Sequence, residues 1–416
     1  MLRIALITIC LIGSCSVSFV SGASQSQNLL DARKGFSTEL LDRNINSYRF
    51  DEPPSDILSI VEYPTSLGNM SAYLTKPTKK GKKFPAIIWI TGGLPVGGAS
   101  SSVWETKSTD NDQSAKSYWQ HGVISMYPSF RGSFNNPGRQ EGFYGEVNDV
   151  LSALEYLSKV EYVDPERIYL GGHSTGATLT LLVAAATDKF RAVFAFGPAA
   201  DPKQYGEKYR FHTDKNSKES YLRAPINFLS YIKSPTYIIE GVNAKIYRFN
   251  ELKGANRNTN VQFFSVDKGN HFNILFPTNR LIASKLSTME RFELTQSEVQ
   301  EAFDDIPVAQ RELQDLRILS NLRSEGIKID SILVARYLVL SRELTPLESS
   351  VKEINSLGFS TNAIKTHKDS DGKTYYSITA SKNIIPTNLT TVSRSSRDIS
   401  AFALQNGFYY QGWGVK

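Results

Sequence analysis

Residues 167–186 read RIYLGGHSTGATLTLLVAAA and contain the most informative pattern of the chain. A predicted strand, residues 167–171, leads into the pentapeptide GHSTG at residues 172–176, and a run rich in leucine and alanine follows. A Gly-x-Ser-x-Gly pentapeptide between a strand and a helix is typical of a tight turn that exposes a serine at the carboxyl edge of a sheet. The flanking glycines allow close approach of neighbouring backbone. This stretch therefore predicts that Ser174 is a nucleophile at the start of a helix.

Apolar runs of strand length alternate with helical patterns on both sides of this turn. Residues 84–90 (FPAIIWI) are continuously apolar, as expected for a strand buried on both faces. Residues 146–158 carry apolar side chains at helical spacing. Further strands are expected at residues 57–63, 71–75, 122–127, 192–196, 236–239 and 261–266. The alternation predicts an α/β fold with a mostly parallel central sheet and helices on both faces.

A serine nucleophile needs a base and donors for the developing oxyanion. Of the five histidines, His271 lies just after the last predicted strand and follows the serine in the chain, whereas His173 lies inside the turn itself. We therefore expect His271 to be the general base. The backbone N–H of Thr175 and the loop at Gly93, after an earlier strand, are the expected oxyanion donors.

Residues 55–280 resemble an α/β-hydrolase of the prolyl oligopeptidase and esterase type. The resemblance rests on the serine turn and on three further segments in the same order. These are residues 127–133 (YPSFRGS), residues 145–150 (GEVNDV), and residues 224–226 with 232–236 (API and IKSPT). The resemblance implies a serine hydrolase that acts on ester or peptide bonds, in which Ser174 attacks the carbonyl and His271 is base and then acid.

The sequence departs from this family at the acid of the triad. The family usually has an aspartate three residues after the glycine that closes the relevant strand, and that place is Ala244 here, beside Asn243. Glu240 at the strand end and Asp201 after the preceding strand are the two candidate acids. Asn243 as an uncharged partner of the histidine, or no acid at all, are the alternatives that remain open, and loss of the acid costs orders of magnitude in rate.

The last quarter of the chain has a different pattern. Residues 313–416 predict a small α+β domain with an antiparallel sheet. Their end, residues 407–414 (GFYYQGWG), resembles the terminal signature of the ribonuclease E inhibitor B family, although Gln411 stands where that family has aspartate. The resemblance implies a ferredoxin-like fold and a protein partner. We expect the hydrolase domain at residues 35–285 and a linker helix at residues 286–312.

The N-terminus is typical of an export signal. Arg3 precedes a nearly apolar stretch, residues 4–12, which is too short to span a bilayer. Residues 12–15 resemble a bacterial lipobox ending in Cys15, whereas residues 21–23 offer small side chains for ordinary signal peptidase. We favour lipidation of Cys15, with residues 1–23 as the signal segment. The protein is then expected in the bacterial periplasm or as a lipoprotein of the cell envelope.

Composition limits the classes of protein to which the chain can belong. The chain has 416 residues, a net charge of +6, 40% hydrophobic and 21% charged residues, which excludes a disordered or collagen-like chain. The basic residues are diffuse apart from the short run at residues 79–83, so no nucleic-acid binding is expected. No cluster has metal-ligand spacing, and we expect no metal and no cofactor.

The leading hypothesis is an exported serine hydrolase with an ester or peptide substrate, whose site is capped by the polar stretch of residues 202–232. The first alternative is a catalytically weak hydrolase scaffold that binds a protein partner through residues 313–416. The second alternative is a cytoplasmic regulator of a ribonuclease, which requires that residues 1–23 are not an export signal.

Overall fold

The computed structural model describes most of the chain beyond the leader. The described residues are 28–41, 50–77, 81–93, 100–105, 111–213, 217–288, 292–305, 315, 318–319, 322, 325–328, 332–368, 372–385 and 389–415. The predicted signal segment and Cys15 lie outside them. Within the described part of the chain, no helix combines the length and the apolar character that crossing a membrane requires.

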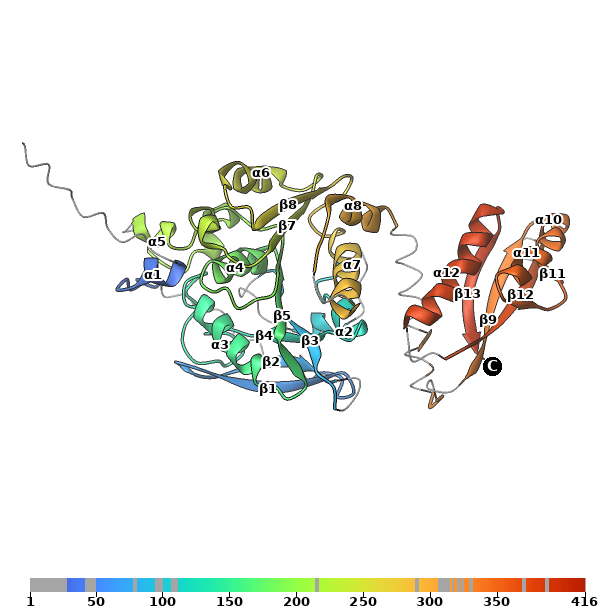
Figure 1. Ribbon diagram of the computed structural model, residues 1–416, viewed down its shortest axis with the longest axis horizontal. Helices are drawn as coiled ribbons and strands as arrows, with labels where there is room; N and C mark the ends of the chain where they lie inside the picture. The colour runs from blue at the N-terminus through green and yellow to red at the C-terminus, as the bar shows by residue number, and fades with distance from the viewer. Residues whose placement is uncertain are drawn as a thin grey trace, which may run out of the picture.

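An eight-stranded sheet forms the centre of the first domain (Figure 1). Its spatial order is β1-β2-β4-β3-β5-β6-β7-β8. The strands are β1 Leu58–Thr65, β2 Gly68–Thr75, β3 Phe84–Ile90, β4 Ile124–Pro128, β5 Val163–His173, β6 Val193–Phe196, β7 Thr236–Gly241 and β8 Val261–Val266. β1 and β2 are antiparallel, and β4, β3 and β5 to β8 run parallel. The predicted α/β class with a mostly parallel sheet is confirmed.

Helices cover both faces of this sheet because its central strands are apolar on both sides. In β3, Ala86 and Ile88 join one buried cluster, whereas Ile87 and Trp89 join the other. The helices of the first face are α3 Glu146–Ser158, α4 Thr175–Ala184 and α6 Ile246–Ala255. Those of the second are α2 Ser117–Gln120, α7 Leu275–Thr288 and α8 Gln296–Asp304. The described residues between β6 and β7 form short helical turns: η3 Pro202–Tyr205, η4 Glu207–Tyr209, α5 Ser217–Tyr221, η5 Pro225–Asn227 and η6 Leu229–Tyr231.

The hydrolase domain extends further at both ends than residues 35–285. At its start, α1 (Leu29–Arg33) places Leu29 in the core with no exposed surface, and the Leu29 N–H donates to the Ala185 carbonyl at 2.9 Å. At its end, α7 runs to Thr288, and α8 buries Val299 and Phe303 in the second cluster. α8 was expected in the linker helix of residues 286–312, but its apolar side packs on the hydrolase domain instead.

The second domain is a separate antiparallel sheet with helices. Its order is β10-β12-β9-β13, and β11 also pairs with β12. The strands are β9 Leu333–Ser341, β10 Ser360–Thr361, β11 Lys365–Lys368, β12 Thr374–Ile384 and β13 Tyr409–Val415, and the helices are α10 Leu344–Ser349, α11 Val351–Ser356 and α12 Leu389–Gln405. This connectivity confirms the predicted α+β ferredoxin-like domain. Trp413 lies in its core and donates its indole N–H to Asp315 at 2.6 Å, whereas Tyr409 is 66% exposed.

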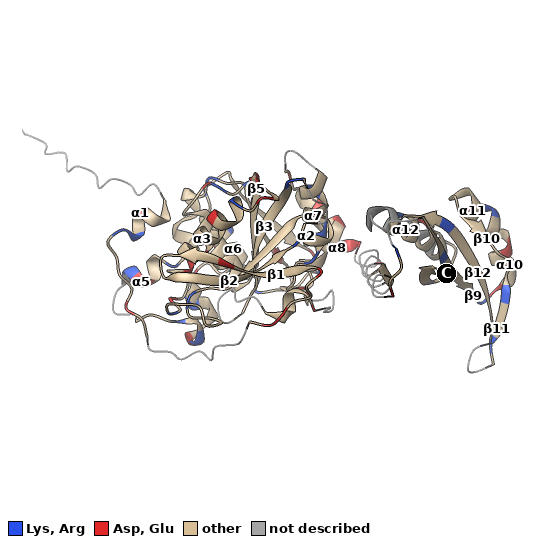
Figure 2. Ribbon diagram, turned by 90° about the horizontal axis from the view of Figure 1, so that it is seen from below, with Lys and Arg blue, Asp and Glu red and all other residues tan. Residues whose placement is uncertain are grey.

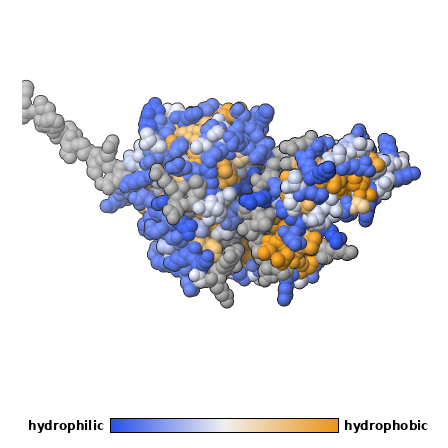
Figure 3. All heavy atoms as spheres, turned by 45° about the vertical axis from the view of Figure 1, so that its right-hand side comes forward, coloured by the Kyte–Doolittle hydropathy of each residue, from blue (hydrophilic) through white to orange (hydrophobic). Residues whose placement is uncertain are grey.

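Charges of both signs are interspersed over the described parts of the two domains (Figure 2). Hydrophilic residues cover most of the face seen in Figure 3, with smaller hydrophobic areas between them. In Figure 2 the basic residues of the described ribbon are spread among acidic ones, whereas a nucleic-acid interface would need them clustered on one face.

Candidate active site

The serine turn has the geometry of a nucleophile elbow. β5 ends at His173, α4 begins at Thr175, and Ser174 between them has φ 54° and ψ −116°. Such positive φ at a residue other than glycine is strained and persists only where the surroundings impose it. A Cβ atom at Gly176 would lie 2.2 Å from the Ile90 carbonyl oxygen, so only glycine allows α4 to approach β3 this closely. The turn therefore holds Ser174 at the carboxyl edge of the sheet, next to the end of β3.

His271 and Glu240 form a hydrogen-bonded pair at the same edge. The His271 Nδ1 lies 3.0 Å from the Glu240 Oε2, and the Glu240 side chain is only 4% exposed. The other carboxylate oxygen, Oε1, accepts the Gly241 N–H at 2.9 Å. Gly197 leaves room for this pair: a Cβ there would lie 2.5 Å from His271 Cε1 and 2.7 Å from Glu240 Oε2. A carboxylate thus orients the histidine through Nδ1 and leaves Nε2 for a reacting group.

Two contacts connect His271 to the elbow. The rings of His173 and His271 lie with their centroids 4.5 Å apart, and the His173 Nε2 lies 2.9 Å from the His271 carbonyl oxygen. The Ser174 N–H donates to the Phe196 carbonyl at 2.8 Å, one residue before Gly197, which borders the His271 ring. The end of β6 is therefore in contact with both the serine turn and the histidine.

The other candidates for the acid are engaged elsewhere. The Asp201 carboxylate accepts the Lys203 N–H at 2.8 Å and caps η3, so it is not the partner of His271. Asn243 contributes a backbone N–H to the Gly269 carbonyl at 2.8 Å. Of the expected positions, only Glu240 is brought to the histidine.

The two expected oxyanion donors, the backbone N–H groups of Thr175 and Gly93, have different surroundings in the structure. Thr175 is the first residue of α4, where backbone N–H groups have no partner within the helix. The Gly93 N–H, in contrast, donates to the Thr175 Oγ1 at 2.9 Å, and the Thr175 hydroxyl donates back to the Gly93 carbonyl at 3.0 Å. The side chain of Thr175 thus occupies the donor that was expected to face the oxyanion. Residues 94–99 of the same loop lie outside the described residues.

His173 is a buried, neutral bridge rather than a base. Burial, with a smaller contribution from nearby His271, lowers the pKa of His173 from 6.5 to about 3. The His173 Nε2 faces the His271 carbonyl oxygen, which can only accept a hydrogen bond. Nδ1 lies 3.0 Å from the side-chain oxygen of Gln113, whose amide nitrogen donates to Asn111. His173 therefore fixes the backbone of His271 from the serine turn.

Replacing His173 with glutamine is expected to flatten the acid side of the stability profile. Between pH 3 and 6.5 the unfolded chain binds a proton at this position and the folded chain does not, so the free energy of unfolding falls as the pH falls. From pH 7 to 5 this loss is about 2 kcal/mol for wild type. His173→Gln keeps a donor for the His271 carbonyl but does not titrate. Urea denaturation at pH 7 and 5 checks this, and equal losses in both proteins would contradict it.

Three side chains near the site carried no sequence signal: Gln113, Phe143 and Tyr205. Tyr205 ends η3, and its hydroxyl lies 2.8 Å from Thr178 Oγ1, one helical turn after Ser174. It belongs to residues 202–232, which were expected to cap the site but contain neither a motif nor a periodic pattern. Among the described residues, no group of three or more histidine, cysteine or carboxylate side chains is arranged to hold a metal ion.

Comparison with known proteins identifies two segments. Residues 110–253 match the prolyl oligopeptidase family, and residues 313–415 match the regulator of ribonuclease activity B family. Similar solved structures include a 2,6-dihydroxy-pseudo-oxynicotine hydrolase, with 18% identity, a TM-score of 0.45, and coverage of 56% of this chain and 68% of that one. An acylaminoacyl peptidase in complex with a chloromethyl ketone has 16% identity, a TM-score of 0.46, and coverage of 59% and 43%. A Pyrococcus furiosus esterase has 17% identity, a TM-score of 0.44, and coverage of 58% and 95%.

The match to this chain thus spans less than half of the acylaminoacyl peptidase. The prolyl oligopeptidase match includes the serine turn, Tyr205 and Glu240, whereas His271 follows its end. Residues 110–253 of this chain are therefore similar to the prolyl oligopeptidase family, and residues 313–415 to the regulator of ribonuclease activity B family.

Proposed function

We propose that the protein is an exported serine hydrolase in which Ser174, His271 and Glu240 form the catalytic triad. The observation that carries this is the 3.0 Å contact between His271 Nδ1 and the buried carboxylate of Glu240. It supplies the acid whose absence from the family position motivated the scaffold alternative. An aspartate at position 244 is not needed once Glu240 reaches the ring from the end of β7.

The three residues of the triad have distinct roles in acyl transfer. The Ser174 hydroxyl attacks the carbonyl carbon of an ester or peptide while His271 Nε2 takes its proton. Glu240 accepts the Nδ1–H and stabilises the imidazolium that forms. The Thr175 N–H, at the positive end of the α4 dipole, stabilises the oxyanion. His271 then returns the proton to the leaving group, and water releases the acyl chain from Ser174 by the reverse sequence.

The export part of the proposal rests on residues 1–23 and on the position of the first folded residues. Leu29 is fully buried, so the folded domain begins shortly after the expected cleavage region. Removal of the leader before residue 28 leaves the domain intact under either cleavage mode. We place the mature protein in the bacterial periplasm or, if Cys15 is lipidated, on the membrane of the cell envelope. Binding of a protein partner by residues 313–416 is the corresponding proposal for the second domain.

Fluorophosphonate labelling of fractionated cells tests both parts of this proposal. Cells that express the full chain are separated into cytosolic, periplasmic and membrane fractions and treated with a tagged fluorophosphonate, which reacts with activated serines. We expect a labelled band in the periplasmic or membrane fraction, with the tag mapped to the peptide that contains Ser174. A Ser174→Ala variant controls for reaction at other serines.

The outcomes separate the two parts. A folded protein that takes no label contradicts the hydrolase assignment. A protein labelled at Ser174 but found only in the cytosol contradicts export and leaves the hydrolase assignment intact.

A further inference from the structure

The Tyr205 side chain comes from the segment between β6 and β7 and places its phenol hydroxyl near the start of α4, which follows the serine turn. Its oxygen lies 2.8 Å from the Thr178 Oγ1, which in turn lies 3.4 Å from the Ser174 carbonyl oxygen. Thr178 is itself fixed, because its Oγ1 accepts the Ala199 N–H at 2.9 Å. Thr178 lies one turn of α4 beyond Ser174, so the Tyr205 hydroxyl bridges the start of this helix.

The ring of Tyr205 is clamped between an aromatic and a cationic side chain. Phe143 stacks on it with 6.1 Å between centroids and 15° between planes. The Arg248 guanidinium carbon lies 5.0 Å from the Tyr205 centroid. Phe143 is fully buried and has φ 71°, a conformation that costs energy at a non-glycine residue. Such strain persists only where contacts hold the backbone in place.

Those contacts come from two buried arginines and one glutamate around residues 141–144. Arg33 donates to the Phe143 and Tyr144 carbonyls at 2.9 and 2.7 Å. Arg223 donates to the carbonyls of residues 141 and 142 at 3.2 and 3.0 Å. The Glu146 carboxylate accepts the N–H groups of residues 141, 142 and 144 at 2.8, 3.2 and 3.1 Å. Every described polar backbone contact of this loop thus fixes the position from which Phe143 presses on Tyr205.

We propose that Tyr205 is a positioning residue of the active site, whose hydroxyl holds the serine turn at Ser174 in place through Thr178. This inference rests on the proposed function, in which Ser174 is the nucleophile. Burial raises the pKa of Tyr205 to about 12, so the phenol keeps its proton throughout the usual assay range and does not compete with His271 as a base. Its role is to hold the serine turn through Thr178, and the reaction chemistry stays with the triad.

Tyr205→Phe tests this by removing only the hydroxyl. We expect kcat for a short-chain p-nitrophenyl ester, and the rate constant of fluorophosphonate labelling, to fall about 10-fold, as the loss of one hydrogen bond implies. KM should change less than about 2-fold, and the pH dependence of kcat/KM should keep its inflection, since Tyr205 does not titrate there. The melting temperature should stay close to that of wild type because the ring stack is retained.

Tyr209→Phe is the matched control. The Tyr209 ring lies 5.3 Å from that of Tyr205, but it stands outside the contacts described above. We expect wild-type kinetics for this variant. Wild-type labelling rates in Tyr205→Phe overturn the proposal, and so does a loss that Tyr209→Phe shares or that follows a lowered melting temperature. A wild-type protein that takes no label contradicts the proposed function itself, whereas wild-type labelling at Ser174 with an unaffected Tyr205→Phe contradicts this inference alone.

Discussion

Replacing Glu240 with glutamine is expected to lower kcat/KM for an ester substrate by about 10⁴-fold. The two carboxylate oxygens accept two N–H groups, from His271 Nδ1 at 3.0 Å and from Gly241 at 2.9 Å. A glutamine has only one acceptor oxygen for these two donors. If its NH₂ group faces His271, the imidazole must carry its proton on Nε2, and that nitrogen no longer accepts the serine proton. If its NH₂ group faces the Gly241 N–H instead, two hydrogen-bond donors face each other in a buried site, which is unfavourable.

The control for this prediction is Asp201→Asn. Asparagine caps a helix start as well as aspartate does, so the contact with the Lys203 N–H at 2.8 Å is preserved while the charge is lost. We expect this variant to keep wild-type kcat/KM. Steady-state kinetics on both variants decide between the two acids. A Glu240→Gln enzyme that retains a tenth of wild-type activity, or an Asp201→Asn enzyme that loses as much as Glu240→Gln, contradicts the assignment of Glu240.

The sequence was sufficient for the parts of the site that follow from backbone pattern. The pentapeptide at residues 172–176 predicted the elbow, because its glycines are required by contacts with the neighbouring strand and helix. The apolar run at residues 84–90 predicted a strand buried on both faces. His271 followed from its position after the last strand. These features depend on local spacing, and local spacing is what a single sequence contains.

The identity of the acid and the partner of the Gly93 N–H depend on distances between segments that are far apart in the sequence. The spacing of residues along the chain does not give these distances. Glu240 reaches His271 because β7 and the histidine loop approach closely: a Cβ at Gly241 would lie 2.4 Å from the Gly269 backbone. A glutamate at the strand end thereby serves where the family has an aspartate farther along the loop. Likewise, only the structure shows that the Thr175 hydroxyl takes the Gly93 N–H. Both depend on side-chain reach across segments distant in sequence.

The buried contacts that surround Tyr205 could not be predicted from the sequence either. Residues 28–41 follow the leader and show no periodic pattern, yet they carry Arg33, which is 7% exposed. Burial and the nearby charge of Arg223 lower the pKa of Arg33 to about 9, which leaves it charged at neutral pH. A charged side chain this deeply buried needs partners, and they lie more than 100 residues away in the chain. Isolated arginines are normally interpreted as surface residues, and nothing in the pattern around Arg33 indicates that it is buried.

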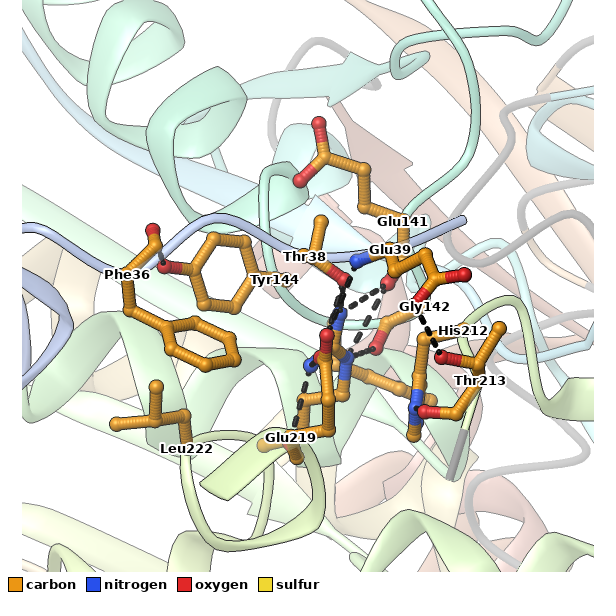
Figure 4. A network of polar contacts seen from close by, with 12 residues as sticks. Phe36, Thr38, Glu39, Glu141, Gly142, Tyr144, His212, Thr213, Glu219 and Leu222 are labelled. Atoms are coloured by element: carbon orange, nitrogen blue, oxygen red, sulfur yellow. Dashed lines mark hydrogen bonds and ion pairs between the residues drawn. The ribbon is translucent and has the colours of Figure 1, made fainter. Parts of the chain in front are cut away.

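Replacing Arg223 with methionine is expected to destabilise the hydrolase domain by about 3–5 kcal/mol. Arg223 and Glu219 form an ion pair whose side chains are 1% and 3% exposed. The same carboxylate accepts the Thr38 hydroxyl and the Glu39 N–H, both at 3.0 Å, as the close-up of this network shows (Figure 4). Without the arginine, the Glu219 charge stays buried with only neutral donors. The shift of the urea midpoint of the full chain measures the loss.

The double variant Arg223→Met/Glu219→Met separates the cost of a stranded charge from the cost of lost packing. Two apolar side chains leave no uncompensated carboxylate, so we expect the double variant to be more stable than Arg223→Met alone. Lys159→Met is the exposed control: its ion pair with Glu155 is 71% exposed on both sides, and the midpoint should not move. A double variant no more stable than Arg223→Met would mean that the arginine stabilises the domain through the carbonyls of residues 141 and 142, not through the ion pair. In that case Tyr205 and Ser174 would depend on Arg223 as a hydrogen-bond donor, and its charge would matter only for pairing with Glu219.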